Sequence, residues 1–249
     1  MTTFLIVCPL VFLAGFVDAI GGGGGLISLP AYLIAGLPAH QAIATNKMSS
    51  TCGTALTTVR FIRQKLINWP MALPAMGTAL LGSYLGANLS LLVDSRILTR
   101  VLYVILPVTA VLVFRKDVLK DSGSTEPPTR KTIMLAALIS FVIGVYDGFY
   151  GPGTGTFLII AFSIFARMDI HAANGLCKAV NLTTNATSLL VFLAGGQVML
   201  VLGLAAAVCN MAGNWLGSGM ALKAGTKITR PIILLVLALL FFRIITGTQ

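Results

Sequence analysis

The sequence predicts an all-α polytopic membrane protein made of two inverted repeats, each with a helix broken at glycines and about four membrane helices. Composition is the first reason, since 57% of the 249 residues are hydrophobic and 10% are charged, whereas about a quarter are charged in a soluble domain. The second reason is the uncharged runs at 19–46, 66–93 and 179–222, because a membrane helix needs about 20 apolar residues. The third reason is an internal duplication.

The second half of the chain repeats the landmarks of the first half in the same order. Gly15-Phe-Val-Asp18 matches Gly144-Val-Tyr-Asp147, and each is followed by a glycine-rich stretch. The later matches pair His40 with His171, Lys47 with Lys178, Gly82-Ser-Tyr-Leu-Gly86 with Gly213-Asn-Trp-Leu-Gly217, Leu98-Thr-Arg100 with Ile228-Thr-Arg230, and Phe114-Arg115 with Phe242-Arg243. We therefore divide the chain into a first transmembrane repeat at 1–116, a cytoplasmic linker at 117–130 and a second transmembrane repeat at 131–249.

Each half contains four long apolar segments and one short one. The expected helices of the first half are 3–20, 39–62, 70–93 and 97–115, with a short segment at 26–36; those of the second half are 132–149, 170–194, 197–222 and 228–247, with a short segment at 155–166. The short segments reach across about half of a bilayer core. Each is either a re-entrant half-helix or part of a spanning helix. The small residues Gly82/Gly86 and Gly213/Gly217 predict close helix packing.

The distribution of basic residues favours inverted halves. Cytoplasmic loops carry an excess of Lys and Arg. With Lys47 and Lys178 set aside as intramembrane, an odd number of crossings per half puts 11 of the other 15 basic residues on one side. Four crossings per half would put only 9 of them there. The odd count implies that both termini lie outside and that the linker is cytoplasmic.

Several classes of function are excluded by what the chain lacks. The net charge of +10 comes mainly from loops between apolar segments, so it reflects membrane topology and not a nucleic-acid surface. The four cysteines have no CxxC spacing and the chain has two histidines, which argues against a metal site or a disulfide framework. Because no catalytic set or cofactor motif is present, we expect neither an enzyme nor a bound cofactor.

Two intramembrane lysines are the leading candidates for binding an anion. A charge inside a membrane segment is costly and is a functional candidate by default. Each lysine starts a polar stripe on one helix face, at spacings of three, seven and ten residues. The stripes are Lys47, Ser50, Thr54 and Thr57, and Lys178, Asn181, Asn185 and Ser188, with further donors at Asn46 and Asn174. The alternative is a snorkelling lysine with Ser/Thr packing contacts, and both interpretations stay open.

The glycine-rich breaks at 21–25 and 151–155 are the second candidate element. Consecutive glycines destabilise a continuous helix, and the half-helix after each break begins with free N–H groups that favour anions. We therefore expect substrate contacts from Gly23, Gly24, Gly153 and Thr154. The alternative is close helix packing through glycine.

Asp18 and Asp147 end the helices that precede the breaks, where a carboxylate meets the unfavourable end of the helix dipole. Three interpretations stay open. Each carboxylate pairs with an intramembrane lysine and an anion competes for that lysine, or one of them carries a coupling proton, or each is interfacial and either faces water or caps a neighbouring helix.

The segments Ala44-Thr-Asn-Lys47 and Tyr146-Asp-Gly-Phe-Tyr-Gly-Pro-Gly-Thr-Gly155, with Gly-x-x-Asp before each break, resemble the TauE/SafE family of sulfite and organosulfonate exporters. The resemblance spans nearly the whole chain. It implies a multi-pass secondary transporter of the bacterial-type inner membrane, moving small sulfur-containing anions such as sulfite or sulfonates, with proton coupling as one option. The alternatives are a passive small-anion channel and a carrier of a non-sulfur organic anion. Direction of transport and homo-oligomer formation stay open.

Overall fold

The computed structural model describes residues 2–94, 97 and 129–224. The helices expected at 97–115 and 228–247 lie outside the described residues, as do most of the linker 117–130 and the repeat matches at Leu98-Thr-Arg100, Phe114-Arg115 and their partners.

The described part of the chain is helical throughout, with eight helices. They are α1 (Thr2–Gly21), α2 (Gly25–Ile34), α3 (Ala39–Arg63), α4 (Trp69–Leu92), α6 (Arg130–Phe149), α7 (Thr154–Ile164), α8 (Ile170–Ala194) and α9 (Leu200–Ala224). All eight helices expected in this part are confirmed, with ends within three residues. Five of them, α1, α4, α6, α8 and α9, are long and apolar enough to cross a membrane. The polar stripe lowers the hydropathy of α3, which has the length of a span as well.

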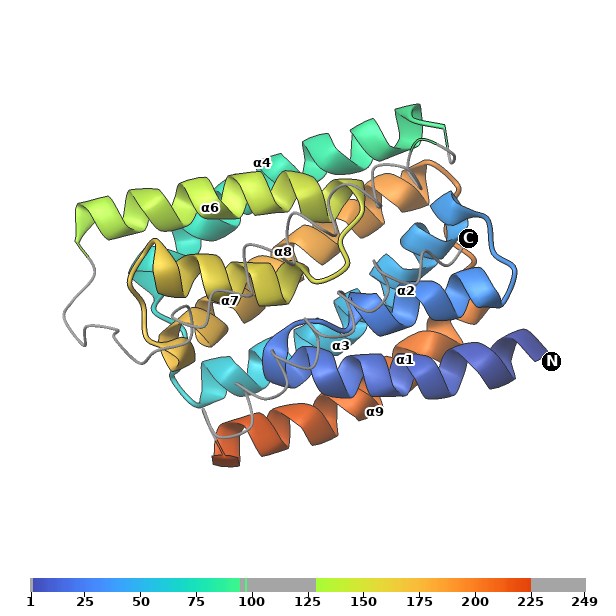
Figure 1. Ribbon diagram of the computed structural model, residues 1–249, viewed down its shortest axis with the longest axis horizontal. Helices are drawn as coiled ribbons and strands as arrows, with labels where there is room; N and C mark the ends of the chain where they lie inside the picture. Colours follow the sequence, from blue (N-terminus) through green and yellow to red (C-terminus); the bar gives the residue numbers. More distant parts are fainter. Residues whose placement is uncertain (1, 95–96, 98–128, 225–249) are drawn as a thin grey trace.

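The two short helices return beside the helices that precede them. In Figure 1, α2 runs back along α1 from the break at Gly22–Gly24, and α7 runs back along α6 from the break after Phe149. Contacts between α1 and α2, and between α6 and α7, hold each pair together. With 10 and 11 residues, these helices are about 15 Å long, so each reaches about half the thickness of a bilayer core.

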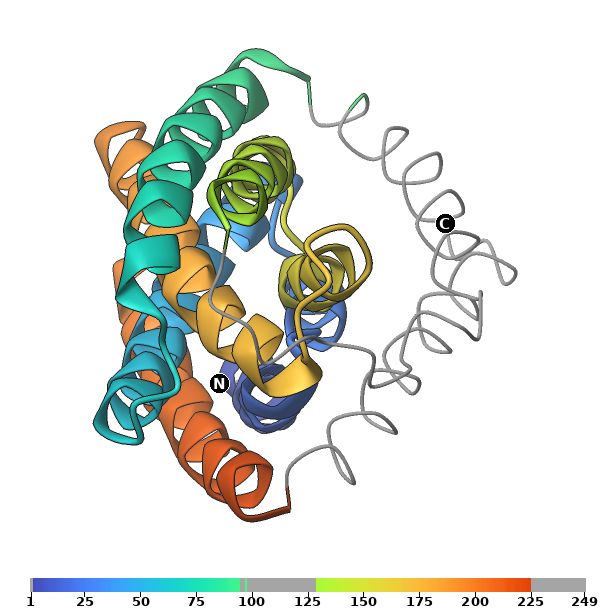
Figure 2. The ribbon, with the colours of Figure 1, turned by 90° about the vertical axis from the view of Figure 1, so that its left-hand side faces the viewer.

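Each half of the chain contributes one long helix that packs on helices of the other half. α4 packs on α6 and α8, while α9 packs on α1 and α3. Figure 2 shows α4 and α9 on the outer left of the bundle, with α1, α2, α6 and α7 gathered on their inner side. In Figure 1, α1 runs from right to left and α6 from left to right, and α3 and α8 also run in opposite directions.

Glycines make the closest of these helix contacts. A Cβ added to Gly82 or Gly86 on α4 would overlap the carbonyl oxygens of Phe141 and Val145 on α6. A Cβ added to Gly213 or Gly217 on α9 would overlap the carbonyl oxygens of Phe12 and Phe16 on α1. The predicted packing role of these small-residue pairs is confirmed, because only a residue without a side chain lets the two backbones approach so closely.

Candidate functional site

The two helix breaks touch one another in the middle of the bundle. The backbone N–H of Thr156 donates a hydrogen bond to Gly22 O at 2.7 Å, and its hydroxyl donates to Gly21 O at 2.8 Å. Gly22 packs directly on Gly155, where neither position has room for a Cβ. Gly22 and Gly153 have φ values of 73° and 83°, which other residues rarely adopt. The glycines therefore permit both the turn in the chain and the contact between the breaks.

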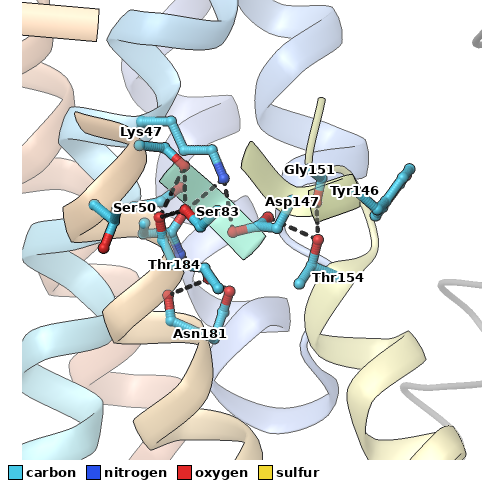
Figure 3. A network of polar contacts seen from close by, with 12 residues as sticks. Lys47, Ser50, Ser83, Tyr146, Asp147, Gly151, Thr154, Asn181 and Thr184 are labelled. Carbon is cyan, nitrogen blue, oxygen red and sulfur yellow. Dashed lines mark hydrogen bonds and ion pairs between the residues drawn. The ribbon is translucent and has the colours of Figure 1, made fainter. Parts of the chain in front are cut away.

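Lys47 of α3 crosses to the second break. Its side chain is 2% exposed, and its Nζ lies 2.8 Å from Asp147 Oδ2 at the end of α6. The same Nζ donates to Asn185 Oδ1 on α8 at 3.1 Å. Figure 3 shows the lysine reaching toward Asp147 from the opposite wall of the site. The only ion pair within the described residues thus joins the first half of the chain to the second.

Neighbouring polar groups extend this pair into a network. Asn185 donates to Asn181 Oδ1 at 3.1 Å, one turn earlier on α8. On the other side, the hydroxyl of Thr154 donates to Asp147 Oδ1 at 2.7 Å. The network therefore runs from α8 through Lys47 and Asp147 to the first residue of α7. A displacement of Lys47 would change its contacts with both Asn185 and Asp147.

Lys178 has a different environment from Lys47. It is fully buried, and its Nζ donates to the backbone oxygen of Asp18 at 2.6 Å. A cation is favoured at this place, since the last carbonyls of α1 carry partial negative charge. The Asp18 carboxylate instead accepts a hydrogen bond from Gly24 N at 3.2 Å, next to the start of α2. The two lysines, equivalent in the sequence, therefore contact their breaks in different ways.

A small polar cavity lies between the breaks and the two lysine-bearing helices. Its volume is about 20 Å³, the scale at which a polar cavity holds a water molecule. Within the described chain, Asn46 Oδ1 is buried and accepts no hydrogen bond. The lining residues are Asp18, Gly22, Gly25, Asn46, Lys47, Ser50, Asp147, Gly151, Gly153, Thr154, Gly155, Asn181 and Asn185.

Nine of the predicted site residues line this cavity and three do not. Lys178, Gly23 and Gly24 are absent from the lining, although Lys178 and Gly24 each donate a hydrogen bond to Asp18. The lining contains one lysine and two aspartates. An anion therefore finds no unpaired cation in this state, and Lys47 becomes available to it only by leaving Asp147.

The far ends of the polar stripes make packing contacts outside the cavity. Thr57 donates to Asn214 Oδ1 on α9 at 2.7 Å. At the corresponding place in the second half, Ser188 Oγ lies 2.8 Å from Ser83 Oγ on α4. Each stripe is thus divided between cavity lining near its lysine and contacts with a neighbouring helix farther along.

Sequence reasoning missed Ser83 and Asn214 as partners of the stripes. A signal was present, because both residues follow the first glycine of a matched pair, Gly82 and Gly213. Polar residues at matching positions of a duplicated packing motif indicate contacts between helices. The two breaks were predicted to contribute to the site, but not through Gly22, Gly25, Gly151 and Gly155, which line the cavity. The sequence does not distinguish one glycine of a break from the next.

Apolar helices long enough to span a membrane, enclosing a buried polar cavity at two helix breaks, define a multi-pass membrane transporter. Residues 7–244 match the family model described as "Sulfite exporter TauE/SafE". The chain belongs to this family, which consists of membrane transporters and not of enzymes.

The chain is similar to several bacterial proteins that carry transporter names. It is 33% identical to the "Probable membrane transporter protein YfcA" of Escherichia coli K12, over 93% of this chain and 85% of the relative. It is 34% identical to the "Probable membrane transporter protein ORF9" of a Sinorhizobium species, over 98% of this chain and 92% of the relative. A Haemophilus influenzae protein with the same type of name is 32% identical over 90% of this chain and 87% of its own length. No solved structure matches the chain.

Proposed function

We propose that the protein is a secondary transporter of small sulfur-containing anions such as sulfite or sulfonates. The observation that carries this proposal is the ion pair of Lys47 with Asp147 at a small polar cavity. A buried lysine with amide and hydroxyl groups beside it suits an oxyanion, once the anion displaces its carboxylate partner Asp147. The sulfur chemistry comes from the family description.

In the proposed bound state the anion takes the place of Asp147 beside Lys47. Asn185 and Asn181 on α8, and Ser50 one turn from the lysine, supply amide and hydroxyl groups from the cavity wall. The start of α7 at Thr154 adds N–H groups and the positive end of a helix dipole. Since the present cavity is of the size of a water molecule, binding requires the cavity to widen as Lys47 leaves Asp147.

Proton coupling follows from the same exchange. Once Lys47 turns to the anion, the Asp147 carboxylate is left buried without a cation, which is strongly unfavourable. Uptake of a proton by Asp147 removes that charge. The anion and the proton would then enter and leave together, with Asp147 as the coupling residue.

We further propose that the halves are inverted repeats that rock against one another. Support comes from the opposite directions of α1 and α6 and of α3 and α8. The reciprocal packing of α9 on α1 and α3, and of α4 on α6 and α8, supports it too. A cavity of only about 20 Å³ between the breaks fits a carrier better than it fits an open channel.

The first test is the thermal stability of the purified protein against a panel of small anions. A ligand that binds only the folded state raises apparent stability by RT ln(1 + [L]/Kd). We expect a shift with sulfite or a sulfonate that is lost in Lys47→Ala/Lys178→Ala. A shift kept in that variant would move the site away from the lysines. Shifts with carboxylates alone would overturn the sulfur assignment.

Proteoliposomes test the carrier mechanism and its coupling. Uptake of labelled sulfite should saturate, and an imposed pH gradient should drive accumulation above equilibrium. Asp147→Asn should keep exchange of sulfite across the membrane but lose the response to the pH gradient. Normal accumulation in that variant would rule out the proton role of Asp147, and flux that never saturates would favour a channel.

A further inference from the structure

A second, larger hollow lies on the outer surface of the bundle between α3 and α9. It has a volume of about 430 Å³. Most of its wall is apolar, while two arginines stand at one end. The lining residues are Cys52, Ala55, Leu56, Val59, Arg60, Arg63, Met211 and Trp215, and we refer to them as the α3–α9 groove.

Arg60 is fixed at the end of the groove by contacts with α9. Its Nη1 donates to Trp215 O at 2.5 Å and to Ser218 Oγ at 2.9 Å. Its guanidinium lies 4.3 Å from the centre of the Trp215 ring, a cation–π contact. Arg63 follows one turn later on α3 and is exposed. Arg60 is therefore held in place beside the apolar part of the groove, with the exposed charge of Arg63 next to it.

Neither arginine has an acidic partner in the described ranges of the chain, where the single ion pair is that of Lys47. Two neighbouring guanidinium groups without a carboxylate repel one another and attract an external anion. Arginine matches a phosphate especially well, because its planar N–H groups bind two oxygens at once. The two arginines of the groove therefore favour binding of an anionic group from outside the protein.

The duplicated half provides an internal comparison. In the repeat alignment that pairs Lys47 with Lys178, Trp215 corresponds to Tyr84 on α4, so the aromatic residue is kept. Arg60 and Arg63 correspond instead to Val191 and Ala194 on α8. The fold therefore does not need a charge at these places, and the arginines serve something found at one end of the bundle only.

We propose that the α3–α9 groove binds an anionic phospholipid of the cytoplasmic leaflet. One acyl chain lies along Val59 and Met211, and the phosphate lies on Arg60 and Arg63. The basic-residue distribution puts this end of the bundle on the cytoplasmic side, where anionic lipids concentrate and where basic pockets between membrane helices bind their headgroups. Trp215 is 56% exposed, so its ring is accessible to a lipid in the groove.

The bound lipid would also influence transport through α3. This helix carries Lys47 at the cavity and Arg60 at the groove, and α9 packs on both α3 and α1. A lipid that bridges α3 and α9 would hold these two helices together, and so favour the state in which their present contacts persist.

Quenching of tryptophan fluorescence by brominated lipids tests the site directly. The chain has two tryptophans, so Trp69→Phe leaves Trp215 as the sole reporter. The variant, purified and stripped of lipid in a neutral detergent, is titrated with brominated phosphatidylglycerol or brominated phosphatidylcholine. We expect saturable quenching by phosphatidylglycerol at concentrations where phosphatidylcholine quenches little.

Arginine variants in the same background separate the groove from the general membrane surface. Arg63→Gln should weaken phosphatidylglycerol binding about fivefold, the effect of one basic residue near an anionic headgroup, and Arg60→Gln/Arg63→Gln should weaken it further. Lys65→Gln, an exposed charge outside the groove lining, is the matched control and should change it little.

Three results would overturn the proposal. One is equal quenching by both lipids, which would mean an unspecific apolar surface. Another is unchanged affinity in Arg63→Gln, which removes a side chain without a described hydrogen bond and so should fold normally. The last is a stable dimer that buries Trp215 and excludes both lipids, which would make the groove an interface between two copies of the chain.

Discussion

Replacing Lys47 by methionine is expected to destabilise the protein strongly, because it leaves a buried carboxylate without its cation. Lys47 and Asp147 are each 2% exposed and their charged atoms lie 2.8 Å apart. Breaking a buried ion pair from one side costs about 3–5 kcal/mol, since the remaining charge stays out of water. We expect a loss of this size from Lys47→Met and a similar loss from Asp147→Asn.

The double variant Lys47→Met/Asp147→Asn should regain most of the lost stability. Removing both charges of a buried pair is often nearly neutral, so the two single losses should be far from additive, with a coupling energy of about 3 kcal/mol or more. The double variant should nevertheless fail to bind sulfite, because Lys47 is absent. The double variant would then be stable but unable to bind sulfite. A purely structural ion pair would not give this result, because binding would return together with stability.

The assay is reversible unfolding of the purified protein in lipid bicelles, followed by the free energy of unfolding, with sulfite binding measured on the same samples. Lys131→Met, an exposed charge at the start of α6, is the control and should change stability by less than about 0.5 kcal/mol. Single losses below about 1 kcal/mol, the range of an exposed pair, would refute the reasoning. Simple additivity in the double variant would do the same.

Two further substitutions test packing apart from binding. Gly86→Ala should lower the free energy of unfolding by about 1–3 kcal/mol, because the new Cβ overlaps Val145 O; Gly77→Ala on the same helix, with nothing within 4 Å, should be neutral or stabilising, and equal effects would contradict the contact. Thr57→Val should cost about 0.6 kcal/mol by removing the hydrogen bond to Asn214, while sulfite affinity should stay unchanged if this part of the stripe lies outside the site.

The helices could be predicted from the sequence because apolar length and glycine breaks are local properties. The helix α3 begins after Pro38 and ends at the basic residues Arg60 and Arg63, while α8 begins after Asp169 and ends before Gly195. The return of α2 alongside α1 could not be predicted in this way. Hydropathy gives the length of a segment and not its direction, and the direction depends on the contacts of α2 with α1 and α3.

The candidate site was only partly accessible to sequence reasoning. Lys47 and Asp147 could be singled out as charges within apolar segments, but their mutual contact joins residues 100 positions apart, which no periodicity reveals. The duplication also made Lys47 and Lys178 look interchangeable. Their difference arises because one meets a carboxylate and the other meets the backbone oxygen of Asp18, a distinction that depends on the tertiary structure.

The seam between the two breaks has a mechanical consequence. Thr156 ties the backbone of one half to Gly21 and Gly22 of the other at the level of the cavity. Any rigid rotation of one half against the other must turn about this seam or break it. If the rotation axis passes through the seam, displacement is smallest at the cavity and largest at the two membrane surfaces. Such a rotation would open the protein to one side of the membrane while closing it to the other.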